Sequence, residues 1–337
     1  MTDLTTDYLG LALKNPLVAS SSPLTGSVDS ALRLQDAGIA AIVMPSLFEE
    51  KIQQEHALLD RFLDEQSIGH AEAETFRPLP PHYRSTEEQY LDTLQALKDA
   101  LEIPVIASLN GTTEGGWLDC ARELAAAGAD ALELNAWHIP DRPEDSAAVV
   151  EQRYIDLTRA ICERVDLPVT VKLGSQFTAP LHLVTQLEAA GARGVSLFNR
   201  FYQPDIDLDS LGIRASLELS SPAESRVRVR WAALLHGHSD CQLAVTGGFH
   251  GAPEALRALL AGADVVQLCS VLLQRGPGVV NEILAAMQQW MAEKEYASLR
   301  QLRGSLCARH APRPADYSRG NYIEVLDRYS APDSVLF

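Results

Sequence analysis

Short apolar runs recur along the chain, and several of them follow an amphipathic stretch that ends in Ala-Gly. The runs are continuous rather than alternating, which is typical of parallel strands covered on both faces. Each glycine is interpreted as a helix stop, after which the chain enters a buried strand. The pattern occurs at Ala37-Gly38, Ala127-Gly128, Ala190-Gly191 and Ala261-Gly262.

Eight runs of this kind predict eight strands, and helical patterns lie between most of them. Eight strands alternating with helices predict an α/β fold, a (β/α)8 TIM barrel. An open doubly wound sheet is the alternative, although it usually has fewer strands and needs an edge. The predicted strands cover residues 16–21, 40–46, 104–110, 131–137, 168–173, 194–199, 243–248 and 265–270.

Two connections are longer than a simple crossover, and they predict insertions after strands 2 and 6 of the barrel. They span residues 47–103 and 200–242, and each follows the C-terminal end of a strand, where barrel active sites lie. Both are candidate lids, and surface insertions without a catalytic part are the alternative. We expect residues 1–310 to form the barrel and residues 311–337 to form a C-terminal extension packed on it.

The composition of the chain excludes several classes of function and of partner. Apolar residues make up 46% and charged residues 22%, the balance of a chain that buries a sizeable core. A formal charge of −17 disfavours nucleic acid and anionic membranes as partners. The five cysteines form no pair or cluster with iron–sulfur or zinc spacing, so we expect reduced thiols and no metal site. The N-terminus lacks an export signal and no apolar run approaches 18 residues, so we expect a cytoplasmic protein.

The ends of the last two predicted strands indicate a phosphate site. Gly247 and Gly248 end the seventh strand and let the backbone approach an anion, while Cys269 and Ser270 end the eighth beside a helix N-terminus. This is the usual phosphate position in such barrels. A tight turn without a ligand is the alternative for the two glycines.

Several motifs together resemble the dihydroorotate dehydrogenase family, and more closely its divergent dihydroorotate dehydrogenase-like members. The resemblance covers nearly the whole chain. Its pieces, besides the two strand ends just described, are Asn15-Pro-Leu-Val-Ala-Ser-Ser, Ile106-Ala-Ser-Leu-Asn-Gly, Leu132-Glu-Leu-Asn and Val171-Lys-Leu.

The resemblance implies FMN lying across the C-terminal ends of the strands. Lys172 would lie beside the flavin N1 region, and Asn110 and Asn135 would hydrogen-bond the ring. A lysine on a barrel strand is costly to bury unless it meets negative charge, which reduced flavin supplies. A structural ion pair is the alternative for Lys172, and a satisfied core amide is the alternative for Asn135. The implied cofactor-binding set also includes Ala19, Ser20, Ser21, Ser46, Asn199, Gly247, Gly248, Cys269 and Ser270.

The chain departs from the family pattern at two places. The family has a lysine-serine pair after strand 2, whereas this chain reads Met44-Pro45-Ser46 and keeps only the serine. After Asn135 the family continues toward a cysteine or serine base, and that position is His138 in this chain. Histidine exchanges protons near neutral pH and can serve as the base. A loop residue without a catalytic part is the alternative for His138.

The sequence therefore predicts an FMN-dependent dehydrogenase of CH–CH bonds, with His138, Lys172 and Asn135 as catalytic residues. Its reaction would be hydride transfer between flavin N5 and a dihydropyrimidine-like substrate, dihydroorotate and orotate first, as in pyrimidine biosynthesis. The alternatives are a flavin-binding redox subunit that has lost its substrate chemistry, and a Schiff-base aldolase or lyase that uses Lys172. The expected partners are a small-molecule substrate, an external electron carrier or redox partner subunit, and a second copy in a homodimer.

Overall fold

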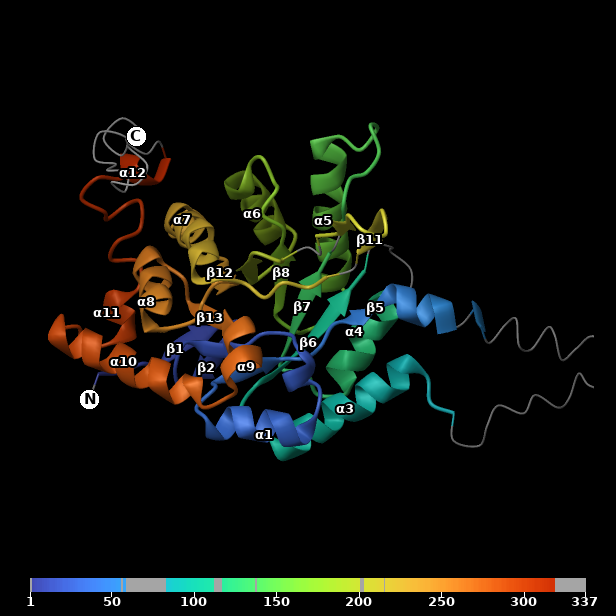
Figure 1. Ribbon diagram of the computed structural model, residues 1–337, viewed down its shortest axis with the longest axis horizontal. Helices are drawn as coiled ribbons and strands as arrows, with labels where there is room; N and C mark the ends of the chain where they lie inside the picture. Colours follow the sequence, from blue (N-terminus) through green and yellow to red (C-terminus); the bar gives the residue numbers. More distant parts are fainter. Residues whose placement is uncertain are drawn as a thin grey trace, which may run out of the picture.

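Parallel strands close into a barrel in the computed structural model, which describes residues 2–55, 57–58, 83–111, 117–136, 138–200, 203–214 and 216–318 (Figure 1). Pairing between β4 (Ala41–Val43) and β6 (Val105–Asn110) closes the ring, and β5 (Leu47–Phe48) pairs with the end of β6. The barrel strands are β3 (Leu17–Ala19), β4 (Ala41–Val43), β6 (Val105–Asn110), β7 (Ala131–Asn135), β8 (Val169–Leu173), β9 (Gly194–Leu197), β12 (Gln242–Thr246) and β13 (Val265–Leu268). Each overlaps one predicted run, so the eight-stranded barrel is confirmed.

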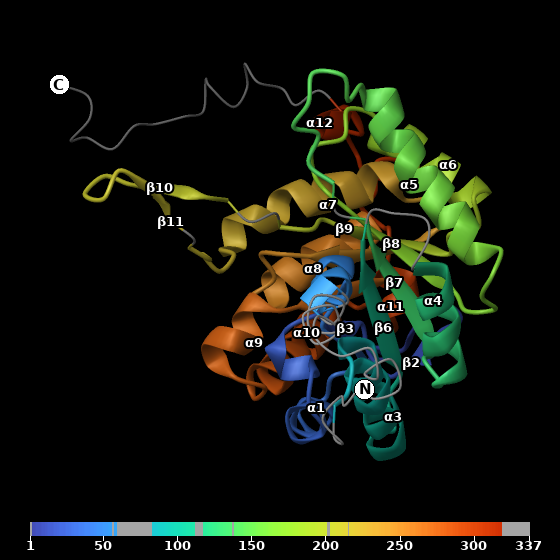
Figure 2. The ribbon, with the colours of Figure 1, turned by 90° about the vertical axis from the view of Figure 1, so that its right-hand side faces the viewer.

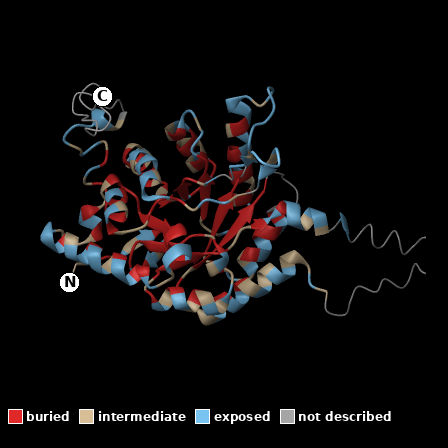
Figure 3. Cartoon of the chain, viewed as in Figure 1, coloured by how far each residue is buried: buried red, intermediate tan, exposed pale blue. Residues whose placement is uncertain are grey.

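Helices cover the outside of the barrel, and their inner faces and the strands form the buried interior (Figure 3). The start of α3 (Thr86–Ala100) shows how local sequence fixes these helices. Ser85 Oγ accepts a hydrogen bond from Glu88 N at 3.1 Å, and Ser85 N donates to Glu88 Oε2 at 3.0 Å. The principal helices are α1 (Val28–Asp36), α3 (Thr86–Ala100), α4 (Trp117–Ala126), α5 (Ala147–Cys162), α6 (Pro180–Ala189), α7 (Ser225–Leu235), α8 (Ala252–Ala261), α9 (Ser270–Arg275) and α10 (Val279–Glu293).

The two halves of the barrel interior differ in chemistry. A hairpin of β1 (Thr6–Tyr8) and β2 (Leu11–Leu13) closes the end at which the strands begin. Its Tyr8, Leu9 and Leu13 pack against apolar side chains inside the strands, such as Val18. Tyr8 is fully buried and its hydroxyl donates to Thr170 Oγ1 at 3.1 Å. Because this end is filled with apolar groups, the polar interior residues lie toward the C-terminal ends of the strands.

The long connections are only partly described. The predicted insertion after the second barrel strand falls largely on residues 59–82, which lie outside the described residues. After β9, the described residues include an antiparallel hairpin of β10 (Asp205–Asp207) and β11 (Gly212–Arg214), and then α7.

The end of the chain continues past the barrel through α11 (Leu299–Leu302) and α12 (Ala315–Ser318). Tyr317 lies in the predicted extension, and its hydroxyl donates to Leu306 O at 2.7 Å. Its backbone carbonyl accepts a hydrogen bond from Arg230 Nε at 2.8 Å. Residues 319–337 lie outside the described part. Among the residues that the structure describes, no helix is both long enough and apolar enough to span a bilayer.

Candidate functional site

A buried ion pair lies in the polar half of the barrel interior. Lys172 Nζ, from β8, is 3.1 Å from Glu133 Oε1 of the neighbouring strand β7. The two side chains are 8% and 0% exposed, so neither charge is solvated by bulk water. Gln267 Nε2, from β13, donates to the other oxygen of Glu133 at 3.0 Å. Glu133 thus fixes the lysine while leaving two of its three N–H groups to other acceptors.

Three asparagines lie at the C-terminal ends of barrel strands β6, β7 and β9, of which β6 and β7 are adjacent. Asn110 of β6 is in register with Asn135 of β7, and Asn199 follows β9. Asn199 Nδ2 donates to Asn135 Oδ1 at 2.8 Å. Asn110 Nδ2 is buried and has no hydrogen-bond partner among the residues that the structure describes. An unpaired buried donor is costly, so Asn110 presents an amide suited to a ligand acceptor.

The serines predicted on the first strands surround the same interior. Ser46 Oγ lies 2.8 Å from Ser108 Oγ, and Ser20 Oγ donates to Gln267 Oε1 at 3.4 Å. Ala19 is fully buried in the main hydrophobic cluster, and its predicted contact with the cofactor stays a prediction. Ser21 is half-buried, and its carbonyl lies 4.0 Å from Cys269 Sγ.

The two ends predicted to bind phosphate come together with a serine that the sequence did not single out. Ser220, in the connection before α7, accepts from Gly248 N at 3.1 Å and donates from its hydroxyl to Ser270 Oγ at 2.8 Å. His250 Nε2 is 3.4 Å from the same Ser220 oxygen. Polar groups from both strand ends therefore meet at the Ser220 hydroxyl, to which Gly248 N donates and which donates to Ser270 Oγ. A backbone N–H and hydroxyls gathered in this way are suited to binding an anion.

Gly247 and Gly248 adopt φ values of +89° and +91° at this turn, a conformation that favours glycine. The turn packs closely on the start of α7. A methyl carbon on Gly248 would overlap Ser225 N, and one on Gly247 would lie 3.0 Å from Arg228 Nη2. Packing against the backbone therefore requires glycine at position 248, and the backbone conformation favours glycine at position 247, whether or not an anion binds.

Arg228 brings a buried positive charge to the turn. Its guanidinium donates to Thr246 O at 3.0 Å and to Glu224 O at 2.9 Å, and the residue is 7% exposed. Burial lowers the pKa of Arg228, and the Glu224 carboxylate opposes that shift. Arg226, Arg228 and Arg230 alternate in sequence, but they lie on a helix, so Arg228 is buried while Arg226 and Arg230 are exposed.

Cys269 is half-buried beside this cluster. Burial raises the pKa of its thiol, and the positive charges of Lys172 and Arg200 partly offset the shift. The thiol is therefore mainly protonated at neutral pH.

His138 lies apart from these residues in its described contacts. Its Nε2 is 2.9 Å from Arg153 Nη1 and 3.7 Å from Asp145 Oδ2. A pocket of about 240 Å³ borders the ring and is also lined by Tyr154 and Phe177, whose rings meet edge to face at 5.1 Å. The histidine therefore faces α5 in this structure, and its role as a base stays a prediction.

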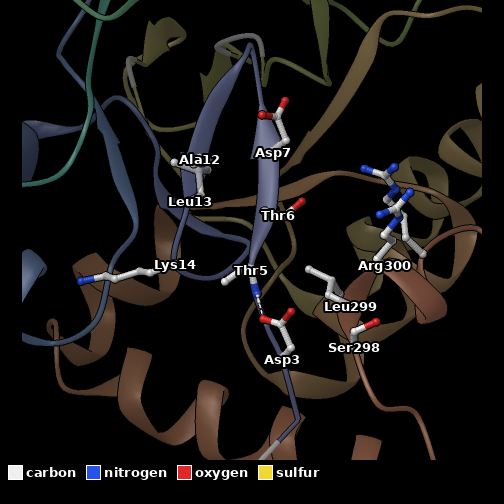
Figure 4. A pocket seen from close by; sticks show the side chains of 11 residues that line it. Asp3, Thr5, Thr6, Asp7, Ala12, Leu13, Lys14, Ser298, Leu299 and Arg300 are labelled. Atoms are coloured by element: carbon white, nitrogen blue, oxygen red, sulfur yellow. Dashed lines mark hydrogen bonds between the residues drawn. The ribbon is translucent and has the colours of Figure 1, made fainter.

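Another pocket, of about 770 Å³, lies at the opposite end of the barrel (Figure 4). Asp3, Thr6 and Lys14 line it together with Arg300 and Arg303. Arg303 is paired with Asp264, and Thr6 Oγ1 donates to Asp264 O at 3.3 Å. None of the predicted site residues lines this pocket, so volume alone does not locate the candidate chemistry.

Four residues of the candidate site were not predicted from the sequence as site residues: Glu133, Gln267, Ser220 and Arg228. The first two occupy interior positions of their strands, and an alternation count through 131–135 and 265–268 could have placed them inside the barrel. Ser220 and Arg228 come from the long connection after β9, where no periodic signal predicts which residues return to the barrel. Across the described ranges, no three His, Cys, Asp or Glu side chains are arranged to hold a metal ion.

Comparison with known proteins gives one family match. Residues 82–291, more than half of the chain, match the model of the family described as dihydroorotate dehydrogenase. The chain is 27% identical to the catalytic subunit of dihydroorotate dehydrogenase B (NAD(+)) from Methanosarcina mazei, over 88% of this chain and 92% of that protein. It is 23% identical to the NAD-dependent dihydropyrimidine dehydrogenase subunit PreA from Escherichia coli, over 90% of this chain and 76% of that one.

Proposed function

The chain belongs to the dihydroorotate dehydrogenase family, and we propose that it is an FMN-dependent oxidoreductase acting on the CH–CH bond of a dihydropyrimidine-like substrate. Dihydroorotate and orotate are the leading substrate pair. One observation carries the proposal: Lys172, three asparagines and the hydrogen-bonded polar groups of Gly248, Ser220 and Ser270 lie toward the C-terminal ends of the barrel strands. Barrel enzymes place their active sites at that end.

Three features support FMN as the cofactor. The unpaired Asn110 amide suits a ring carbonyl, and Lys172 has N–H groups left for the N1 side of the ring. Gly248 N and the hydroxyls of Ser220 and Ser270 suit the phosphate, with Arg228 adding positive charge behind the turn. When bound, FMN supplies a hydride acceptor at N5.

His138 is the proposed proton acceptor, three residues beyond Asn135. Oxidation of a CH–CH bond removes a hydride from one carbon and a proton from the next, so a base must reach the second carbon. In the described arrangement Arg153 and Asp145 hold the ring. The proposal therefore requires the loop after β7 to turn His138 toward the strand ends when substrate binds.

The visible absorbance of the purified protein, followed by anaerobic addition of dihydroorotate, tests the proposal. We expect a flavin spectrum that bleaches with dihydroorotate, and bleaching slowed by about 10²–10⁴-fold in His138→Gln, as for loss of a general base. Arg142→Gln, an exposed change in the same loop, is the control. A flavin that stays oxidised would exclude dihydroorotate as substrate, and a colourless protein that takes up no added FMN would exclude the cofactor.

Cysteine labelling tests the phosphate position without turnover. We expect FMN to slow alkylation of Cys269, because a phosphate held by Gly248 and Ser270 would cover the thiol. Cys162 is the matched control: it is also half-buried, burial raises its pKa to about 11, and it lines a pocket at the other end of the barrel. Mass spectrometry of the labelled peptides measures both sites, and equal labelling of Cys269 with and without FMN would contradict the assignment.

Partners of the enzyme belong to the same proposal. Two relatives are named as subunits, one catalytic and one of a dihydropyrimidine dehydrogenase. We therefore propose that an external electron carrier or a redox subunit accepts the electrons. The aldolase alternative is less favoured, because a Schiff-base lysine must be neutral to attack and Lys172 faces a buried carboxylate.

A further inference from the structure

The connection after β9 leaves the barrel through the hairpin of β10 and β11 and returns to it just before α7 (Figure 2). The returning residues 218–224, here called the return segment, include Ser220, whose hydroxyl contacts Gly248 N and Ser270 Oγ. No periodic pattern fixes this segment, because it lies between a hairpin and a helix. Its place at the strand ends therefore depends on the contacts that other elements make with it.

Arg200, which follows Asn199 beyond β9, contacts both ends of the return segment. Its Nε donates to Glu224 Oε2 at 3.0 Å, and its Nη1 donates to the carbonyl oxygen of Glu218. The planar fork of a guanidinium can make both contacts at once, whereas the ammonium of a lysine is a single point charge. Arginine at this position is therefore suited to holding the segment in one place.

The Glu224 carboxylate joins this contact to the local structure of the segment. Its other oxygen accepts from Ser221 N at 3.0 Å, and Glu224 N donates to Ser221 O at 3.1 Å, so the segment ends in a capped turn. The carbonyl of Glu224 accepts from Arg228 Nη1 at 2.9 Å. Glu224 is therefore held through its side chain by Arg200 and through its backbone by Arg228.

The return segment also packs directly on the glycine turn after β12. A methyl carbon on Gly248 would lie 3.0 Å from Ser221 O and 3.0 Å from the carbonyl carbon of Glu224. A shift of the segment would therefore move the Ser220 hydroxyl and, with it, the surface on which Gly248 rests. Groups that bind a ligand lose affinity when they must first be brought into place.

The ion pair of Arg200 and Glu224 is not built to stabilise the fold. The two side chains are 34% and 31% exposed, and ion pairs that reach solvent contribute little to stability. The pair nevertheless connects the end of β9 to a residue 24 positions further along the chain. Its contribution is therefore to the geometry of the connection rather than to the free energy of unfolding.

We propose that Arg200 is a positioning residue for the cofactor phosphate: through Glu224 and Glu218, it holds the return segment in the place that the phosphate requires. Ser220 and the Gly248 N–H thereby stay aligned before FMN binds. The inference rests on the proposed binding of FMN. It assigns to Arg200 an effect through the segment and not a contact of its own with the phosphate.

A direct effect of the Arg200 charge on the phosphate is the rival explanation. Burial raises the pKa of the Cys269 thiol beside the turn, and the positive charges of Lys172 and Arg200 partly offset that rise. If Arg200 acted by charge alone, Glu224→Gln would remove an opposing negative charge and strengthen FMN binding. If the pair positions the segment, the same change weakens binding, although glutamine can still accept from Ser221 N.

Fluorescence titration of the flavin-free full chain with FMN, and with riboflavin, which lacks the phosphate, tests the proposal. We expect Arg200→Gln and Glu224→Gln each to weaken FMN binding by about tenfold, and the double variant to lose no more than either, because all three remove one contact. Arg200→Lys keeps the charge but not the fork, so it should stay weakened. Riboflavin binding should be unchanged in every variant.

Arg159→Gln is the matched control. It removes the same charge from an ion pair of the same length, 3.0 Å between Arg159 Nη1 and Asp156 Oδ1, but both partners lie on α5. An ion pair within one helix holds no connection in place, so we expect unchanged affinity for both flavins.

Hydrogen exchange of residues 218–224 gives a readout that does not depend on FMN. We expect faster exchange there in Arg200→Gln and Glu224→Gln than in the unmodified flavin-free protein, and no change in Arg159→Gln. An unmodified protein that binds no FMN would overturn the proposed function. Faster exchange in the two variants would even then support Arg200 as the residue that positions the segment.

Three results would overturn the inference itself. Tighter FMN binding in Glu224→Gln would show that Arg200 acts by its charge. Equal losses of FMN and riboflavin affinity would show a general disturbance of the site rather than an effect on the phosphate. Unchanged exchange of residues 218–224 in Arg200→Gln would show that other contacts hold the return segment.

Discussion

Replacing Lys172 with methionine is expected to destabilise the protein by about 3–5 kcal/mol, because the change leaves Glu133 buried without its cation. The carboxylate would keep one hydrogen bond, from Gln267, and no solvent reaches it in the described structure. Denaturant unfolding of the apoprotein measures this loss. A change below about 1 kcal/mol would mean that the charge is neutralised or hydrated in a way that the 3.1 Å pair does not indicate.

Adding Glu133→Gln to that variant separates stability from chemistry. A neutral glutamine can still accept from Gln267, so we expect the double variant to regain most of the lost stability. The rate at which substrate reduces the flavin of this variant should nevertheless fall by about 10²–10³-fold, the loss expected when one donor that stabilises developing charge is removed. Rapid reduction in the double variant would mean that Lys172 is only half of a structural ion pair.

Gly248→Ala is expected to be the most damaging small substitution at the candidate site. The new methyl group would overlap Ser225 N and lie 3.0 Å from Ser221 O, and both atoms belong to the backbone. Backbone strain at φ +91° adds to that overlap. Together they should cost about 3 kcal/mol or more, and the displaced Gly248 N–H should weaken FMN retention. Thermal unfolding and flavin content of the purified protein measure the two effects.

Gly128→Ala is the control for this substitution. Gly128 follows α4 with a φ of +92°, yet a methyl group there would meet no atom within 4 Å. The control therefore carries the conformational strain alone, about 1–2 kcal/mol, and should leave FMN retention unchanged. Equal losses for Gly128→Ala and Gly248→Ala would show that the turn after β12 is less tightly packed than its contacts indicate.

Most of the barrel was predictable because its signals are local. Continuous apolar runs identify parallel strands, and glycines such as Gly191 and Gly262, which adopt φ values of +106° and +119°, identify the helix ends before them. The candidate site was predictable at strand ends for a related reason. A closed parallel barrel gathers the C-terminal ends of all its strands at one rim, so residues near those ends, such as Asn110, Asn135 and Lys172, are expected at the same rim. Their selection as site residues came from the resemblance to the family's motifs.

The sequence by itself therefore determined the eight strands and the residues near their ends, and it favoured a closed barrel over an open doubly wound sheet. Only the tertiary structure decided which side chains pair inside: Glu133 with Lys172, 39 positions apart, and Ser220 with Gly248 and Ser270. It also decided that His138 contacts α5 and that Ile206 and Ile213, on the hairpin of β10 and β11, face solvent. The reason is physical: periodicity records which face of an element is buried, whereas partners across a barrel or along a non-periodic connection depend on how the whole chain packs.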